Sequence, residues 1–225
     1  MNVKDLFFPK LCVGCGATGN YICSVCITQI QALKPACPYC GKASIDGFTH
    51  SRCAKKWGLD GLIAVWPYEK VIKKAIWNLK FKYALDLAEE LAGLYCETLK
   101  NNQIFIPRFG NITAVPMFWY KENLRGFNQS DILAEKMGKL LGLQTVKLLE
   151  KVRPTSSQVD LNYMDRKKNL KGAFAILPGK VMEKYINVFL FDDVFTTGST
   201  LKEACRILKI AGVQHVWGIT LVRKA

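Results

Sequence analysis

The chain has 225 residues, half of them hydrophobic, enough for one α/β domain with a sizeable core and a small appendage. It has no run of 18 apolar residues, and its first residues lack the apolar stretch of a signal peptide, which excludes a membrane-spanning protein and argues against a secreted one. We therefore expect a cytoplasmic protein with no membrane insertion. The net charge of +14 predicts a polyanionic partner such as nucleic acid; the alternative is a lysine-rich surface that is only solvated.

Seven of the nine cysteines crowd into the first 53 residues. Three Cys-x-x-Cys pairs and one His-x-x-Cys pair supply the eight ligands of two tetrahedral zinc sites: Cys12, Cys15, Cys23, Cys26, Cys37, Cys40, His50 and Cys53. Consecutive pairing, four ligands to each ion, is the simplest arrangement, and an interleaved one stays open. His50 is the weakest member, because a lone histidine in a loop is often only solvated; without it a single zinc would remain. We expect structural zinc, since a segment this short depends on metal to fold.

The cysteine pairs end before Trp57, and apolar periodic segments follow it. We therefore predict a zinc-binding module at 1–56, similar to a double zinc ribbon, and an α/β domain at 57–225. Hydrophobic patterns predict helices at 69–83, 84–100, 129–141 and 200–211, and strands at 62–66, 112–116, 145–151, 173–177, 188–191 and 215–222. Strands that alternate with helices indicate a mostly parallel sheet. Cys96 and Cys205 lie within helical patterns and are expected to be small buried hydrophobes.

Residues 188–200 join an apolar strand, two adjacent acids and a loop of hydroxyls and glycine to a helix start. Parallel sheets bind ligands beyond the carboxyl ends of their strands, so we expect Asp192 and Asp193 to lie beside a ligand. Adjacent carboxylates can accept hydrogen bonds from vicinal hydroxyls or hold hydrated Mg²⁺, and the loop that follows can wrap a phosphate. The alternative without a ligand is an Asp-Asp helix cap before a Thr-rich turn.

This stretch resembles the phosphoribosyl pyrophosphate (PRPP) motif of type I phosphoribosyltransferases. The resemblance implies that fold, an α/β architecture with a mostly parallel sheet flanked by helices. It also implies that Asp192 and Asp193 contact the ribose hydroxyls of Mg²⁺-bound PRPP. The 5-phosphate would then lie in the loop that follows, formed by Thr196, Thr197, Gly198, Ser199 and Thr200.

Further motifs occur in order along the chain: Leu79-Lys80-Phe81-Lys82-Tyr83, Val115-Pro116, Arg125-Gly126-Phe127-Asn128-Gln129, Ser157-Gln158 and Gly172-Ala173-Phe174. Together with the cysteine pairs and the Asp-Asp loop, they are similar to the ComF family, the ComFC competence proteins of bacteria. The resemblance spans essentially the whole chain. It implies PRPP binding and a role in natural transformation, in handling incoming single-stranded DNA with other cytoplasmic DNA-uptake proteins. The departure is His50, where most members have cysteine.

Basic side chains along the chain predict a nucleic-acid surface, namely Lys55, Lys56, Lys70, Lys73, Lys74, Lys80, Lys82 and Arg125. Trp57 and Tyr83 lie in the same stretch and could stack unpaired bases. The alternative makes Trp57 a packing anchor and leaves the lysines solvated. Gly126 allows a turn into a helix that Asn128 can cap, which would project Arg125 beside the pocket. The polar segment 153–171 resembles a mobile loop that closes over a ligand.

The sequence identifies neither a catalytic residue nor an acceptor base. Thr196 stands where purine-salvage members of the fold have an aspartate, which argues against a hypoxanthine-guanine enzyme. A DNA-uptake factor with a PRPP-binding, transferase-like domain accounts for the zinc module, the charge and the loop together. The alternatives are a nucleotide-salvage phosphoribosyltransferase, which explains only the loop, and a PRPP-sensing DNA-binding regulator without turnover, which explains the loop and the charge. Whether PRPP is turned over stays open.

Overall fold

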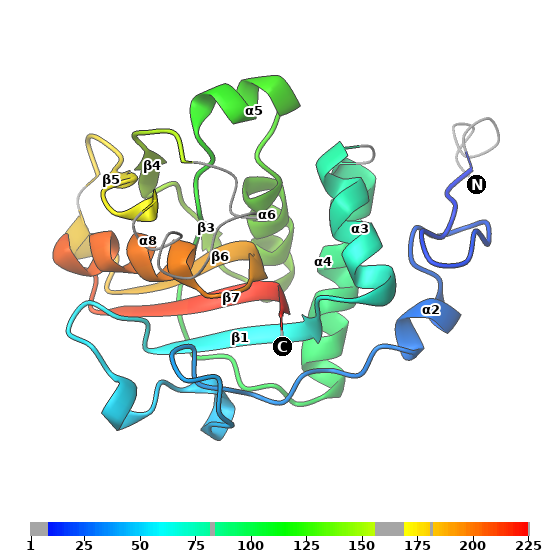
Figure 1. The fold of residues 1–225 in the computed structure, drawn as a ribbon, viewed down its shortest axis with the longest axis horizontal. Helices are drawn as coiled ribbons and strands as arrows, with labels where there is room; N and C mark the ends of the chain where they lie inside the picture. The colour runs from blue at the N-terminus through cyan, green and yellow to red at the C-terminus, as the bar shows by residue number, and fades with distance from the viewer. Residues whose placement is uncertain (1–8, 82–83, 156–168, 181, 225) are drawn as a thin grey trace.

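The structure is a computed structural model that describes residues 9–81, 84–155, 169–180 and 182–224. Its centre is a five-stranded sheet in the order β1-β7-β6-β2-β3, with every neighbouring pair parallel. In that order the strands are Gly61–Pro67, His215–Arg223, Asn187–Phe195, Asn111–Ala114 and Gln144–Thr145. Figure 1 shows β6, β7 and β1 side by side with their carboxyl ends together. The predicted α/β class with a mostly parallel sheet is confirmed.

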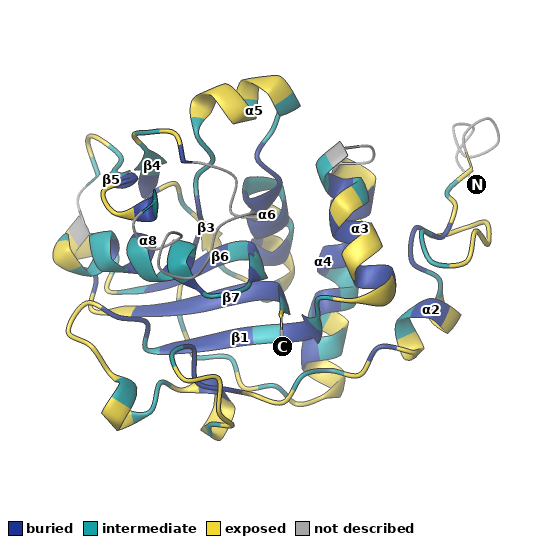
Figure 2. Cartoon of the chain, viewed as in Figure 1, coloured by how far each residue is buried: buried dark blue, intermediate teal, exposed yellow. Residues whose placement is uncertain are grey.

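Alternation along β6 builds two cores, one on each face of the sheet. Phe189 and Phe191 face one core, whereas Val188 and Leu190 face the other, and all four are fully buried. A strand that is covered on both faces has apolar residues at successive positions, and this explains the continuous apolar run that predicts the strand at 188–191. Figure 2 shows β6 and β7 buried along most of their length.

Helices cover both faces of the sheet. One core contains residues of the helices on one face, which are α3 (Lys70–Phe81), α4 (Ala84–Asn101) and α6 (Gln129–Leu141). The other contains α8 (Ser199–Ile210) and a small antiparallel sheet of β4 (Leu149–Lys151) and β5 (Phe174–Ile176). Cys205 is fully buried in α8, as expected, whereas Cys96 is half-buried in α4. None of the described helices combines the length and apolarity needed to cross a membrane.

The cysteine-rich segment does not form one compact unit. It contains α2 (Ser24–Thr28) and two short 3-10 turns, η1 (Ile45–Gly47) and η2 (Ser51–Cys53). Cys12 and Cys26 join the core beneath α3 and α4, while Tyr39 packs against the core beneath α8. Between them the chain follows the edge strand β1, where the Leu33 N–H donates to the Val65 carbonyl at 2.8 Å. Figure 1 shows the two halves at different ends of the sheet.

Two predicted elements differ from the structure. The strand expected at 145–151 is split, because β3 pairs with β2 for only two residues before the chain leaves the sheet and β4 pairs antiparallel with β5. The strand predicted at 173–177 therefore lies outside the parallel sheet. A periodic pattern reports which residues are buried, but not which strand pairs with them. The helix α5 (Trp119–Arg125) was not predicted; it has no buried residue and so carries no periodic apolar signal. A third 3-10 turn, η3, spans Met182–Lys184.

Candidate functional site

Asp192 and Asp193 lie in the last half of β6, where only one neighbouring strand remains. The pairing of β6 with β2 ends at Phe191, whereas its pairing with β7 continues to Phe195. One side of β6 is therefore open next to the two acids, at the carboxyl edge of the sheet. This is the edge at which parallel sheets bind ligands.

Asp193 forms an ion pair with Lys80 at the end of α3, with Nζ and Oδ2 2.6 Å apart. Burial would lower the pKa of Lys80, but the charge of Asp193 outweighs it and raises that pKa. Lys80, predicted for the nucleic-acid surface, therefore lies beside the two acids, and its contact with nucleic acid stays a prediction. Lys80 follows the fully buried Leu79 and lies one turn after the fully buried Ile76, so the packing of α3 turns it toward the sheet edge.

Asp192 holds its proton more strongly than an exposed aspartic acid does. Burial and then the neighbouring charge of Asp193 raise its pKa to about 8, against the opposing charge of Lys80. Its Oδ1 accepts hydrogen bonds from the Asp193 N–H at 2.9 Å and from the Ser130 hydroxyl at 3.4 Å. Two acids thus lie beside one lysine, and a bound cation would favour the ionised form of both.

The hydroxyl-and-glycine loop turns directly into α8. Gly198 has a φ of +70°, and a Cβ atom there would lie 2.4 Å from the ring of Phe195, so this position requires glycine. Thr197 and Ser199 hold each other through their hydroxyls at 2.8 Å. The Lys202 ammonium donates to the Thr197 carbonyl at 2.8 Å, which fastens the loop to the first turn of the helix.

The acids, Lys80 and the loop meet at one cavity of about 380 Å³. Six of the seven predicted PRPP residues line it: Asp192, Asp193, Thr196, Gly198, Ser199 and Thr200. Thr197 does not, because its side chain is turned to Ser199. Tyr68 and Lys224 also line the cavity, and sequence reasoning missed both. They directly follow β1 and β7, so the rule that ligands meet the carboxyl ends of parallel strands could have found them.

Arg125 lies at the end of α5, close to this cavity. Its guanidinium donates to the side-chain carbonyl of Gln129, and burial lowers its pKa while the charge of Asp193 opposes that shift. Asn128 caps α6 as predicted, since its Oδ1 accepts from the Ser130 N–H at 3.1 Å. The Arg125 cation is thus near enough to Asp193 for their charges to interact.

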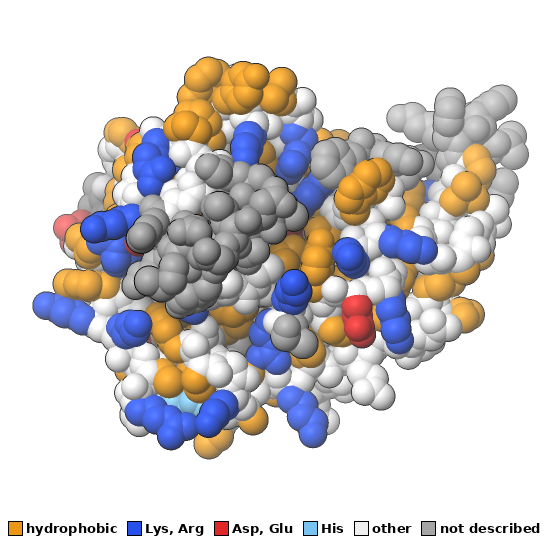
Figure 3. Space-filling view, viewed as in Figure 1, with side chains coloured by type: hydrophobic (Ala, Val, Ile, Leu, Met, Phe, Trp, Pro, Cys, Tyr) orange, Lys and Arg blue, Asp and Glu red, His pale blue; other side chains and the backbone are white. Residues whose placement is uncertain are grey.

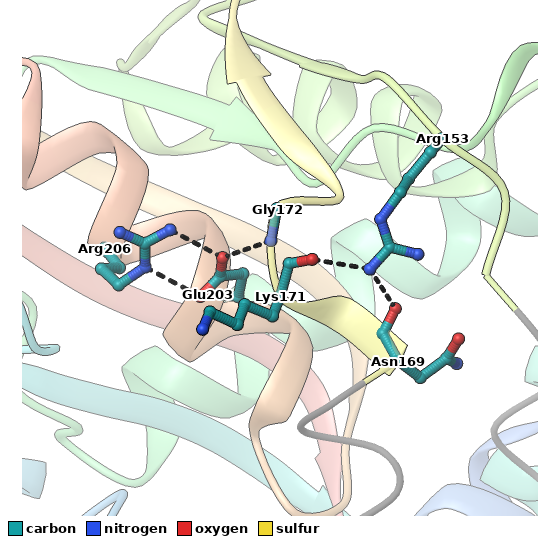
Figure 4. Close-up of polar contacts among 6 residues, drawn as sticks. All are labelled: Arg153, Asn169, Lys171, Gly172, Glu203 and Arg206. Carbon is teal, nitrogen blue, oxygen red and sulfur yellow. Dashed lines mark hydrogen bonds and ion pairs between the residues drawn. The ribbon is translucent and has the colours of Figure 1, made fainter.

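The predicted loop at 153–171 is described only at its two ends, and 156–168 lies outside the described residues. Figure 4 shows how the ends are held: Arg153 Nη2 donates to the carbonyls of Asn169 at 3.0 Å and Lys171 at 2.6 Å. Next to them, the Gly172 N–H donates to Glu203 of α8 at 3.0 Å. The base of the segment is therefore anchored to the helix that begins at the hydroxyl-and-glycine loop. Its closure over a ligand stays a prediction.

The first four cysteines form one cluster. The sulfurs of Cys12, Cys15, Cys23 and Cys26 all lie within 4.8 Å of one another, and Cys15 and Cys23 are 3.6 Å apart. Sulfurs that share a tetrahedral zinc lie roughly 3.8 Å apart, so the cluster fits this metal. Burial would raise the pKa of Cys12, but hydrogen bonds from backbone N–H groups outweigh it and lower the pKa to about 6. The thiolate that zinc requires is thereby favoured.

The remaining four predicted ligands form a second cluster, so the structure agrees with consecutive pairing. The ligand atoms of Cys37, Cys40, His50 and Cys53 lie within 4.8 Å of one another. His50 Nε2 lies 3.1 Å from the Ala43 carbonyl, which can only accept, so Nε2 carries the proton. Nδ1 is left as the metal ligand, 3.3 Å from the Cys40 sulfur. The structure thus brings His50 to the place where a fourth ligand is needed.

The residues of the predicted nucleic-acid surface come from different elements. Lys55 and Lys56 lie beside α8 and line a second cavity, whereas Lys70, Lys73 and Lys74 lie on α3, which packs on the other face of the sheet. Lys82 and Tyr83 lie outside the described residues. Figure 3 shows many Lys and Arg side chains and few acidic ones on the face that it displays. The predicted residues thus lie on different elements, and a single nucleic-acid surface formed by them stays a prediction.

Three comparisons relate this architecture to known proteins. A family model described as a double zinc ribbon domain matches residues 3–55. The chain is 30% identical to Competence protein F of Haemophilus influenzae, over 95% of this chain and 97% of that protein. It is 32% identical to the DNA utilization protein YhgH of Escherichia coli K12, over 94% and 96%.

Among solved structures, the chain is similar to glutamine PRPP amidotransferase from B. subtilis, with a TM-score of 0.41 and 16% identity. The match covers 64% of this chain and 30% of that enzyme. The relatives named for competence match the chain over nearly its full length, and the cysteine segment matches a zinc ribbon. The chain belongs to the ComF family of competence proteins.

Proposed function

We propose that this protein binds Mg²⁺-PRPP at the edge of its sheet and handles single-stranded DNA during natural transformation, in the cytoplasm. The observation that carries the PRPP proposal is the convergence of two carboxylates, a lysine and a hydroxyl-and-glycine loop on one cavity. Each group has a complement in PRPP: acids for the ribose hydroxyls, N–H groups for phosphate and cations for pyrophosphate. An Asp-Asp helix cap would not need this convergence.

The roles of the individual residues follow from their positions. Asp192 and Asp193 would accept hydrogen bonds from the ribose hydroxyls. The loop around Gly198 and the first N–H groups of α8 would hold the 5-phosphate, where the positive end of the helix adds to the attraction. Lys80 and Arg125 would stand toward the pyrophosphate, whose negative charge they neutralise.

Magnesium fits the same place. Two adjacent carboxylates beside a phosphate site are a typical setting for Mg²⁺, which keeps several waters and takes one or two protein carboxylates. Asp192 and Asp193 would hold this ion, whose charge would offset that of the bound pyrophosphate. No described residue is assigned as a base for an acceptor, so the proposal is one of binding.

Two observations support the handling of DNA, namely the net charge of the chain and the names of its relatives. The relatives carry the names competence protein and DNA utilization protein, and this chain has a net charge of +14. Basic groups lie on both sides of the PRPP cavity: Lys73 stands over the ring of Tyr68, which lines the cavity, and Lys55 belongs to a neighbouring cavity that shares Ser199. A single strand could therefore reach the PRPP site from either side.

Isothermal titration with PRPP and Mg²⁺ tests the first part. Replacing Asp192 and Asp193 with Asn keeps the shape of both side chains and removes their charge, and we expect PRPP affinity to fall more than about a hundredfold. The matched control is Asp131→Asn, which removes an acid that pairs with Lys147 away from the cavity. Unchanged titration heats in the double variant would show that the carboxylates are not the ribose contacts.

Two further measurements separate the alternatives. Binding to single-stranded and duplex oligonucleotides is compared over a range of salt concentrations, and we expect the single strand to bind more tightly with little sequence preference. Preference for duplex would favour the regulator instead. Incubation with PRPP and each free nucleobase tests the salvage enzyme, for which product nucleotide is the diagnostic result.

A further inference from the structure

A second cavity, of about 550 Å³, lies between the second cysteine cluster and α8. Cys40 and Cys53 of that cluster form part of its wall, and Ser199, the first residue of α8, lines both this cavity and the PRPP cavity. The two cavities are thus neighbours across the first turn of one helix. A volume of this size suits a nucleotide.

The lining of this cavity is strongly cationic. It contains five basic side chains, Arg52, Lys55, Lys56, Lys202 and Arg206. Its one acid, Glu203, is already engaged: Arg206 donates to it from Nε at 2.9 Å and Nη2 at 2.8 Å, and the Gly172 N–H adds a third bond at 3.0 Å (Figure 4). The cavity therefore has an excess of positive charge that its own residues do not neutralise.

Lys202 shows this excess most clearly. No ion pair among the described residues includes it, and its ammonium donates to the Thr197 carbonyl and lies 5.0 Å from the centre of the Tyr39 ring. Burial, and then the charge of Lys55, lower its pKa to about 8. An anion in the cavity would favour the charged form of Lys202 and offset its repulsion with Lys55.

Two aromatic residues accompany these cations. Tyr39 is held in place, since its hydroxyl accepts a hydrogen bond from the Leu59 N–H at 2.9 Å and its ring faces Lys55 and Lys202. Trp57 is 40% exposed, with the Lys56 ammonium 4.7 Å from its ring centre. A large exposed indole within a cationic pocket can stack a base while the cations hold phosphates.

We infer that this cavity is a nucleotide subsite for single-stranded DNA, in which a base stacks on Trp57 and the flanking phosphates contact Lys55, Lys56 and Arg52. The inference rests on the proposed function and specifies where the strand binds. It moves the DNA surface away from Lys70, Lys73 and Lys74 of α3. A duplex would not bind this cavity in the same way, because its bases are paired and stacked and cannot reach the Trp57 indole.

Fluorescence anisotropy with a labelled oligonucleotide of about 10 nucleotides tests the site. In the variant Lys55→Glu/Lys56→Glu we expect affinity at low salt to fall more than about tenfold, and the slope of log affinity against log salt to fall by about 1 to 2. Trp57→Ala should weaken binding about fivefold or more, and Trp57→Phe, which keeps an aromatic face, should lose less. The matched control is Lys70→Glu/Lys73→Glu/Lys74→Glu on α3, which should lose less affinity than the Lys55 and Lys56 pair.

The outcomes separate the inference from the proposed function. Zinc content should match wild type in all variants, and PRPP titration heats should match it in the Trp57 variants and in the Lys55 and Lys56 pair, which shows that the fold persists. If wild type binds the oligonucleotide but Trp57→Ala and the Lys55 and Lys56 pair bind it equally well, the subsite is wrong while DNA handling stands. If wild type binds PRPP but no single strand, the DNA part of the proposed function fails, and the subsite with it.

Discussion

The two cavities that meet at the first turn of α8 differ in their charge. The proposed PRPP cavity is lined by two acids of β6 and two lysines, Lys80 and Lys224, so it holds charges of both signs. The neighbouring cavity has five cations, two aromatic rings and one acid that is already paired. A sugar with vicinal hydroxyls suits the first, and a strand of nucleotides suits the second. Net charge therefore says less about binding than the local arrangement of charges around one helix end.

The two cysteine clusters also differ in what they contact. The second cluster forms part of the wall of the cationic cavity through Cys40 and Cys53. The first cluster lies by α4, where Glu90 accepts from the N–H groups of Tyr21 at 3.0 Å and Ile22 at 2.5 Å. One zinc would thus shape a ligand site and the other would fasten the chain to the core.

The largest effect should come from removing one zinc ligand in each cluster. Metal analysis should find two zinc ions per chain in wild type and about one in either Cys12→Ser or Cys37→Ser. Only Cys37→Ser should weaken single-strand binding, by more than about tenfold, because only that cluster forms the wall of the cationic cavity. Equal loss of DNA binding in the two variants would remove the distinction between the clusters. A folded wild-type chain without metal would overturn the zinc prediction itself.

The pH dependence of stability should reveal Asp192, the acid with the raised pKa in the proposed PRPP cavity. Asp192 ionises at an ordinary value of 3.8 in the unfolded chain but only at about 8 when folded, so the folded state holds the extra proton between these values. Stability should therefore be highest at low pH with respect to this group and should fall as pH rises toward 8, by roughly 2 kcal/mol between pH 6 and 8.

In Asp192→Asn, the free energy of unfolding should change less between pH 6 and 8, and the variant should be more stable than wild type at pH 8. Urea unfolding of both proteins at several pH values measures this, and the difference between the two curves cancels effects common to both, such as loss of zinc. Parallel curves for the two proteins would mean that Asp192 is ionised throughout, and that the contrast between the cavities is smaller than described.

The smallest effect should come from a lysine that contacts the loop of one site and lines the other. Lys202 holds the Thr197 carbonyl of the phosphate loop and lines the cationic cavity. Lys202→Met keeps the length of the side chain and should weaken both PRPP and single-strand binding by roughly fivefold, the value of about one hydrogen bond. Lys209→Met, which removes a lysine paired with Asp60 at the other end of α8, is the control. Loss of only one of the two affinities would show that the cavities do not share this residue.

Much of the fold could be predicted because its signals are local. The buried run before Asp192 and the helix of Leu201, Ala204, Cys205 and Leu208 each carry their periodicity in one short stretch. The split strand at 145–151 and the helix α5 could not be predicted. The first depends on which partner strand is available, and the second contributes no buried residue to a pattern.

The sequence by itself identified the side chains of the cysteine clusters and of the cavity at the end of β6, because these side chains lie close together in the chain. Cys-x-x-Cys pairs and the run from Asp192 to Thr200 bring their groups together within one turn or loop, whatever the rest of the chain does. The tertiary structure alone decided which distant residues join them. Lys80 pairs with Asp193, and Lys202 reaches Tyr39, only because α3 and α8 pack on opposite faces of the same sheet. These contacts span most of the chain, and no local pattern records them.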